Sequence, residues 1–192
     1  MPLGSISPIA KSAFLTAQRS RSFLTGREFS FAADDIIVSK TDTKGVIRYV
    51  NEVFVHVSQF REVELLGAPH SILRHPAMPR CVFKLMWDTI AAGQEIFAYV
   101  VNRAKTGDAY WVFAHVTPTF DHAGHIIGYH SSRRKPDEAV VERVRPIYAA
   151  LVAEEAGHAN KAAGLAASTA LLQKTVAATG MRYEEFVFSL AA

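Results

Sequence analysis

Hydrophobic and polar positions divide this chain into two kinds of segment. Short segments rich in β-branched and aromatic residues, bounded by turn residues, predict strands. They cover residues 36–41, 46–50, 95–103, 109–120 and 125–134. Segments with apolar residues three and four positions apart predict helices. They cover residues 51–58, 62–66 and 79–92, all between the second strand and the third.

Tight turns join the predicted strands. Residues 42–45, 106–108 and 121–124 each contain Asp and Gly, which are typical of short turns between strands. The order along the chain is therefore two strands, a block of short helices and a three-stranded meander. A five-stranded antiparallel sheet with its helices on one face is the economical α+β arrangement for this order.

Helical segments flank this central unit. Pro8 lies early in a predicted helix over residues 8–24, and a second helical stretch begins near Pro136, with Pro146 expected to kink or divide it. Gly157 separates that stretch from an Ala-rich helix, and apolar residues form a last helical stripe at residues 183–190. The predicted organisation is a helical cap at 1–28, a central domain at 29–135 and a helical extension at 136–192.

Composition excludes several classes of protein. Hydrophobic residues make up 49% of the chain and charged residues 20%, which is typical of a globular protein. The net charge is +3, and the basic cluster at 133–135 is interpreted as solvated, so we expect no nucleic-acid partner. The single Cys81 suits a reducing cytoplasm. No run of 18 apolar residues is present, so we expect a soluble protein that does not insert into a membrane.

A series of short motifs carries a family resemblance. Arg74-His75-Pro76, Met86-Trp87 and Tyr110-Trp111-Val112 follow one another between a short helix, a longer helix and an aromatic strand. Asn51-Glu52-Val53-Phe54 precedes them at the start of the helical block. In this order the motifs resemble a PAS sensory domain, and within that class the sensor domain of bacterial aerotaxis receptors. The resemblance covers about residues 29–135.

The resemblance implies a cofactor and a site. Relatives of this kind bind FAD non-covalently between the sheet and the short helices, and report its redox state to a chemotaxis or other signalling partner. By position, the implied flavin contacts are Asn51, Arg74, His75 and Trp87. A guanidinium can hold a pyrophosphate, an indole can cover a ring face, and an amide such as Asn51 or Asn102 can bond a ring edge.

Each of these residues also has a structural interpretation. Arg74 and His75 can fix a loop, Trp87 lies on an apolar helical face, and Asn51 can cap the helix that follows it. Tyr110 and Trp111 are expected to build the sheet.

Other chemistries have weaker support in the sequence. The eight histidines lack the spacing of a zinc site with an adjacent Glu, so we expect no metal site. Haem through His75 or His115 stays open, although the helix at 79–92 contains no His. Cys81 lacks the motif context of a photoreceptor thiol and is expected to be a buried, inert thiol. No nucleophile elbow or phosphate-binding loop is present, so we expect no enzyme.

Two function classes follow. The first is a cytoplasmic redox or oxygen sensor that binds FAD, acts as a homodimer and signals to another protein. The second is a ligand-free PAS module for protein interaction or dimerisation, motivated by the apolar stripes at 140–152 and 183–190. A haem-based gas sensor is the third and weaker hypothesis.

Overall fold

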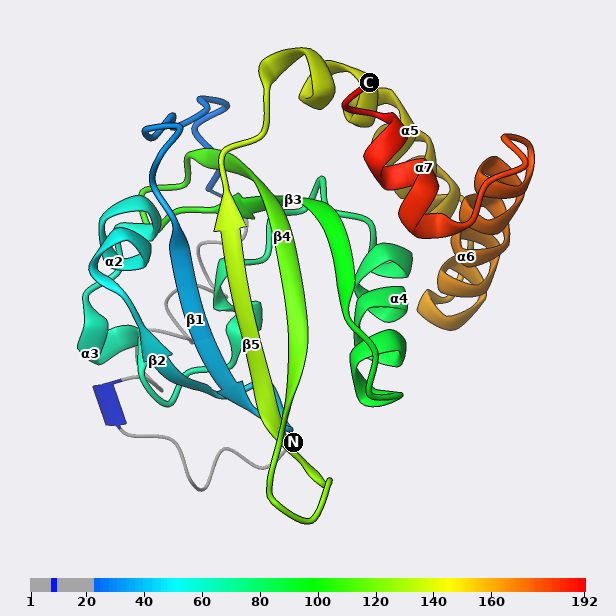
Figure 1. Cartoon of the computed structure of the whole chain (residues 1–192). Coiled ribbons are helices and arrows are strands. Elements are labelled where there is room, and N and C mark those ends of the chain that lie inside the picture. Colours follow the sequence, from blue (N-terminus) through cyan, green and yellow to red (C-terminus); the bar gives the residue numbers. More distant parts are fainter. Residues whose placement is uncertain (1–7, 10–22) are drawn as a thin grey trace.

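A five-stranded antiparallel sheet forms the centre of the protein (Figure 1). In this computed structural model, residues 8–9 and 23–192 are described. The spatial order of the strands is β2-β1-β5-β4-β3, so the chain's first two strands extend an edge of the later meander. The strands are β1 (Ile37–Asp42), β2 (Ile47–Val50), β3 (Ile96–Arg103), β4 (Ala109–Phe120) and β5 (Ile126–Arg134).

Short helices lie between β2 and β3 in the chain and pack on one face of the sheet (Figure 1). The side chain of Asn51 caps the N-terminus of the first of these helices, since the backbone N–H of Phe54 donates to its Oδ1 at 3.0 Å. These elements are α2 (Glu52–Ser58), α3 (Glu62–Leu65), the 3₁₀ helix η2 (His70–Leu73) and α4 (Arg80–Ala91). Their apolar side chains, among them Phe54, Leu65 and Ile72, are buried in the main core with those of the sheet.

The alternation of side chains along the strands separates two faces. Val100 and Asn102 of β3 face the short helices, whereas the ring of Tyr99 lies on the opposite side, with its centre 4.8 Å from that of Phe113. Gly128 of β5 lies where two strands approach closely, since a Cβ atom there would lie 2.3 Å from the carbonyl oxygen of Thr41. A larger residue at 128 would therefore push β5 away from β1.

Three further helices follow the sheet and cover part of its other face. They are α5 (Glu138–Ala156), α6 (Lys161–Ala177) and α7 (Tyr183–Ser189). The hydroxyl of Tyr148 in α5 donates to the carbonyl oxygen of Tyr99, and its ring lies 5.9 Å from that of Trp111. The ring centre of Phe188 in α7 lies 4.9 Å from that of Phe97. The helix α6 packs against α4 and α5, beyond the β3 edge of the sheet (Figure 1).

The predicted fold class is confirmed: the sheet has five antiparallel strands, with the short helices on one face. Pro146 was expected to kink or divide the second helical stretch, and it does not divide it, because α5 continues through it. Pro146 lacks an N–H and cannot bond to Glu142, but the buried Val144 and Tyr148 hold the helix on both sides.

The N-terminal helix predicted for residues 8–24 lies almost entirely outside the described residues. Residues 8–9 are helical, but the prediction is wrong for Phe23 and Leu24, which are not. Within the described ranges, none of the helices combines the length and hydrophobicity that a membrane span requires.

Candidate functional site

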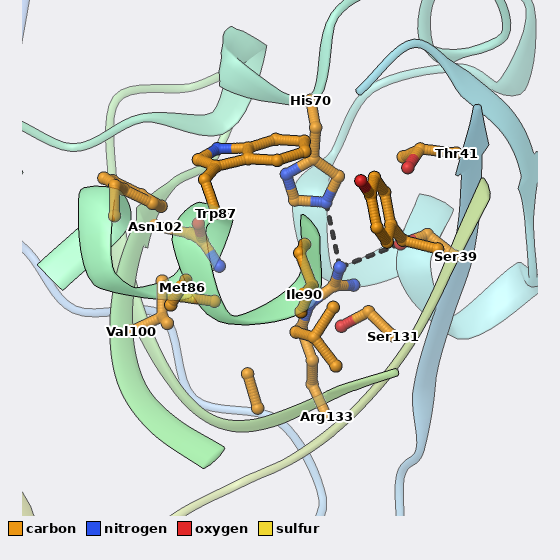
Figure 2. Close-up of a pocket in the computed structure, with 14 residues that line it drawn as sticks. Ser39, Thr41, His70, Met86, Trp87, Ile90, Val100, Asn102, Ser131 and Arg133 are labelled. Carbon is orange, nitrogen blue, oxygen red and sulfur yellow. Dashed lines mark hydrogen bonds between the residues drawn. The ribbon is translucent and has the colours of Figure 1, made fainter. Parts of the chain in front are cut away.

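A cavity lies between the sheet and the helix α4, with a volume of about 80 Å³. Its lining is apolar on the helix side, where Phe83, Met86 and Ile90 of α4 face Val100 and Val116 of the sheet. Polar side chains gather at the other end, on β1, β5 and η2 (Figure 2). The polar lining residues at this end are Ser39, Thr41, His70, Tyr129, Ser131 and Arg133, whereas Asn102 lies apart from them on β3.

Arg133 is the charged residue of this polar end. Its side chain enters from β5 and is 5% exposed. One terminal nitrogen, Nη2, donates to Oγ of Ser39 at 2.8 Å and to Nε2 of His70 at 2.9 Å (Figure 2). The guanidinium also lies 5.5 Å from the ring centre of Phe54. No carboxylate is among the residues that line the cavity.

His70 is neutral in this arrangement. Burial, followed by the positive charges of Arg133 and Arg74, lowers its pKa from 6.5 to about 3. Since Arg133 can only donate, Nε2 of His70 accepts, and the ring proton lies on Nδ1. Burial likewise lowers the pKa of Arg133 to about 10, so the guanidinium stays charged at neutral pH. The polar end of the cavity therefore carries a net positive charge.

Trp87 lies at the mouth of the cavity. Its side chain projects from α4 and is 38% exposed, and its ring meets Tyr129 edge-on at 5.5 Å. A Cβ atom at Gly45 would lie 2.8 Å from the Trp87 ring, so the absence of a side chain there makes room for the indole. Gly45 also has a φ of +75°, which glycine adopts without strain. The indole thus reaches from α4 to the turn between β1 and β2.

Of the other residues predicted from the sequence, Asn102 lines this cavity and Arg74 lies next to its wall. Asn102 of β3 is 3% exposed and lines it. Arg74 stacks on Phe83, with 4.5 Å from its guanidinium carbon to the ring centre, and Phe83 lines the cavity wall. A backbone bridge joins Arg74 to Asn102. The structure therefore brings Arg74, Trp87 and Asn102 together.

Asn51 and His75 lie elsewhere. The amide of Asn51 accepts from the N–H groups of Phe54 and Val38, both at 3.0 Å, and donates to the carbonyl of Ile36 at 2.8 Å. All three bonds hold backbone, so Asn51 acts as the helix cap that the sequence offered as its structural interpretation. Nδ1 of His75 accepts from the N–H of Ala77 at 3.1 Å, within its own loop. Neither residue lines the cavity.

Sequence reasoning missed the polar end. The interpretation of residues 133–135 as a solvated cluster is wrong for Arg133, although Arg134 and Lys135 are exposed. Strand alternation was the available signal, because it places Arg133 on the same face as Ser131 and Tyr129 and places Arg134 on the other. Tyr110 and Trp111 are buried in the sheet as expected.

A family comparison covers most of the elements around this cavity, with the exception of β1. Residues 47–133 match the sequence profile of the family described as PAS fold. That range begins at the first residue of β2 and ends at Arg133, so it includes α4 and the three-stranded meander.

Curated relatives match over a longer range. The aerotaxis receptor of Escherichia coli (strain K12) is 38% identical over 132 residues, which is 69% of this chain and 26% of the receptor. A nitrogen fixation regulatory protein of Klebsiella pneumoniae is 28% identical over 134 residues, 70% of this chain and 26% of that protein. The chain thus spans about a quarter of the length of these relatives.

Solved structures support the fold. A light-oxygen-voltage domain studied with a flavin analogue superposes with a TM-score of 0.51 at 17% identity, over 57% of this chain and 82% of that one. The dark structure of the blue-light photoreceptor Aureochrome1 LOV gives a TM-score of 0.50 at 21% identity, over 59% and 82%. Together with the profile match and the strand order, these comparisons show that the chain contains a PAS domain related to that of the aerotaxis receptor.

Proposed function

We propose that this protein is a redox or oxygen sensor that binds FAD, with the isoalloxazine ring between the sheet and α4. The observation that carries the proposal is the cavity itself, which has apolar walls for the faces of a planar ring and a cluster of hydrogen-bond donors at one end. Its context is a PAS domain related to that of an aerotaxis receptor.

The size of the cavity sets a condition on binding. Its 80 Å³ is below the roughly 300–1,000 Å³ of typical ligand pockets. A tricyclic ring enters only if side chains at the mouth move aside. Trp87 is placed to do so, since its indole is partly exposed and lies over the turn at Gly45. Met86, which is unbranched, is the second adaptable side chain of the wall.

Each polar residue would have a separate task. Arg133 and Ser131 would bond the edge of the ring, Asn102 would bond it from β3, and Trp87 would cover its outer face. Arg74 lies outside the lining, behind Phe83, where a guanidinium suits a phosphate of the dinucleotide tail. The flavin would supply reversible electron uptake, and the protein would tune it through charge and hydrogen bonds.

The helix α4 is the physical route from the cavity to the C-terminal helices. It carries Trp87 at the cavity, and its first turn is bonded to α5 through Arg80, whose Nε lies 2.7 Å from Oε2 of Glu155. A movement of Trp87 on flavin reduction would shift α4 against α5 and α6, as a two-state switch requires. We propose that these helices present the change to a signalling partner in the cytoplasm, such as a chemotaxis receptor, and that the sensor is a homodimer.

The test is a titration of the purified protein with FAD, followed by flavin fluorescence and by the visible spectrum before and after dithionite. The proposal expects saturable quenching and a reversible spectral change. Trp87→Phe should bind FAD more weakly, whereas Trp111→Phe, on the other face of the sheet, should bind it as the wild type does. If the wild type binds neither FAD nor FMN, the redox function is wrong.

A ligand-free interaction module is the second candidate, and the small cavity volume favours it. It predicts no flavin binding, together with self-association that residues 136–192 control. A haem sensor has less support, because His70 is the histidine among the cavity-lining residues and its Nε2 already accepts from Arg133. A strong Soret band after haem addition would restore that hypothesis.

A further inference from the structure

Arg133 is a buried cation whose hydrogen-bonding capacity is only partly used. Nη2 has two partners, Ser39 and His70. Nη1 is buried and bonds to none of the residues that the structure describes. Leaving a buried charged donor without a partner is costly, since the group has lost its water and gained nothing in exchange.

Its surroundings do not compensate the charge. The guanidinium takes part in none of the ion pairs found among the described residues, and the two groups bonded to Nη2 are a hydroxyl and a neutral imidazole. The ring face of Phe54 offers a weak attraction. A cation buried in this way lowers the stability of the folded protein unless a negative or electron-rich group completes its shell.

A second polar atom lies on the same side of β5. The hydroxyl of Ser131 is buried and also has no partner among the described residues. Ser131 and Arg133 alternate onto one face of the strand, and both line the cavity (Figure 2). Two hydrogen-bonding groups without a partner among the described residues therefore lie at the polar end of the cavity.

We propose that Arg133 and Ser131 form a binding subsite for the carbonyl-bearing edge of a planar ring ligand, and that Arg133 favours the form of the ligand that carries negative charge there. This inference rests on the proposed function and assigns the orientation of the ring within it. The apolar wall of Met86, Ile90, Val100 and Val116 contacts the ring faces. The acceptor edge then points toward β5 and β1.

The consequence for a flavin concerns its reduction potential. When dithionite supplies two electrons and the solvent supplies one proton, the ring gains one net negative charge. A fixed guanidinium at the ring edge stabilises that charge more than it stabilises the oxidised ring, so it raises the potential. Arg133 thus sets the redox conditions under which the sensor responds.

Arg133→Met is the variant that tests the subsite, and Arg134→Met is its matched control, because Arg134 is the exposed neighbour on the other face of β5. In the ligand-free protein, Arg133→Met should leave the thermal midpoint unchanged or raise it, since it replaces an uncompensated charge by a side chain of similar volume. It should weaken FAD binding by about tenfold to a hundredfold. Arg134→Met should change neither quantity.

The reduction potential of the bound flavin is the third quantity to measure. If reduced flavin loses about tenfold more affinity than oxidised flavin, the two-electron potential of Arg133→Met falls by about 30 mV. Arg133→Lys keeps the charge but has a single donor group, so its potential should fall less than that of Arg133→Met. Ser131→Ala should weaken binding by less than either, since it removes one neutral bond.

Different results would reject the proposed function and the Arg133 subsite. If the wild type binds no flavin, the proposed function fails. If it binds flavin and Arg133→Met retains both affinity and potential, the subsite is wrong while the function stands. A ligand-free Arg133→Met that unfolds or melts well below Arg134→Met also overturns the subsite, because it would make Arg133 a structural residue.

Discussion

Two charged side chains with little solvent exposure, one on α5 and one on β5, have opposite surroundings. Glu155 of α5 is 9% exposed and accepts from three donors: Nε of Arg80 at 2.7 Å, the N–H of Cys81 at 3.1 Å and Oγ of Ser168 at 3.1 Å. Arg133 is buried to a similar degree, yet one of its terminal nitrogens has no partner among the described residues. Both lie near the same helix.

The difference separates a structural role from a binding role. Glu155 neutralises Arg80 and caps the first turn of α4, so its own lone pairs and the helix N–H group satisfy one another. Arg133 leaves part of its donor capacity inside a cavity. A cluster in which every polar group is hydrogen-bonded fixes the position of a helix. A cluster in which one donor has no partner leaves that donor able to bond to a ligand.

The largest expected effect on stability comes from changing Glu155. Glu155→Gln should lower the free energy of unfolding by about 2–3 kcal/mol, somewhat less than the loss of one partner of a fully buried pair because Arg80 is 32% exposed. Glu154→Gln, which removes a contact with the exposed His158, is the control. Urea unfolding followed by circular dichroism measures both. Equal midpoints for the two variants would mean that Glu155 does not hold α4 in place.

A smaller loss of stability is expected at Asn51, because its side-chain amide, like the Glu155 carboxylate, makes three hydrogen bonds. Asn51→Ala should cost about 1–2 kcal/mol of stability through the lost helix cap and the lost bond to Val38. The folded variant should bind FAD with unchanged affinity, since Asn51 does not line the cavity. A loss of FAD affinity without a loss of stability would mean that Asn51 contacts the ligand, as the family resemblance implies.

His70 gives a smaller, pH-dependent effect. Its pKa is lowered from 6.5 to about 3 in the folded protein, so the unfolded chain binds a proton first as the pH falls. The contribution of neutral His70 is complete above pH 6.5 and is lost as the pH falls from there toward 3. Between pH 6 and pH 5 this loss amounts to about 1 kcal/mol.

His70→Asn, which keeps an acceptor for Arg133, removes the titrating group. Unfolding curves at pH 6 and pH 5 should therefore differ less for this variant than for the wild type. His125, which is exposed on the turn between β4 and β5, provides the control variant His125→Asn. The same pH dependence in His70→Asn and in the wild type would mean that another group is responsible.

The sequence predicted the strands and short helices well, because their signals are local. The β-branched content of the strands, the turn glycines and the motifs at Arg74 and Tyr110 each act within a few residues. Helix α5 is not divided at Pro146, since burial of Val144 and Tyr148 outweighs the lost bond there.

The site was less predictable than the fold. Trp87 was found through the family resemblance and Asn102 through the chemistry of its amide, and both line the cavity. Arg133 was missed because a charge beside two other charges at a strand end suggests solvent exposure. The partners that bury it, Ser39 and His70, are 94 and 63 positions away in the chain, so local composition could not indicate them.

The most direct measurement is a crystal structure of the protein with FAD bound. We predict that the ring lies between the sheet and α4, with Nη1 of Arg133 about 2.7–3.2 Å from an oxygen or nitrogen atom of the ring edge. The Trp87 indole should have moved away from Gly45. A ring bound outside this cavity, or an Nη1 that bonds to a protein group with the ring at a distance, would contradict the account.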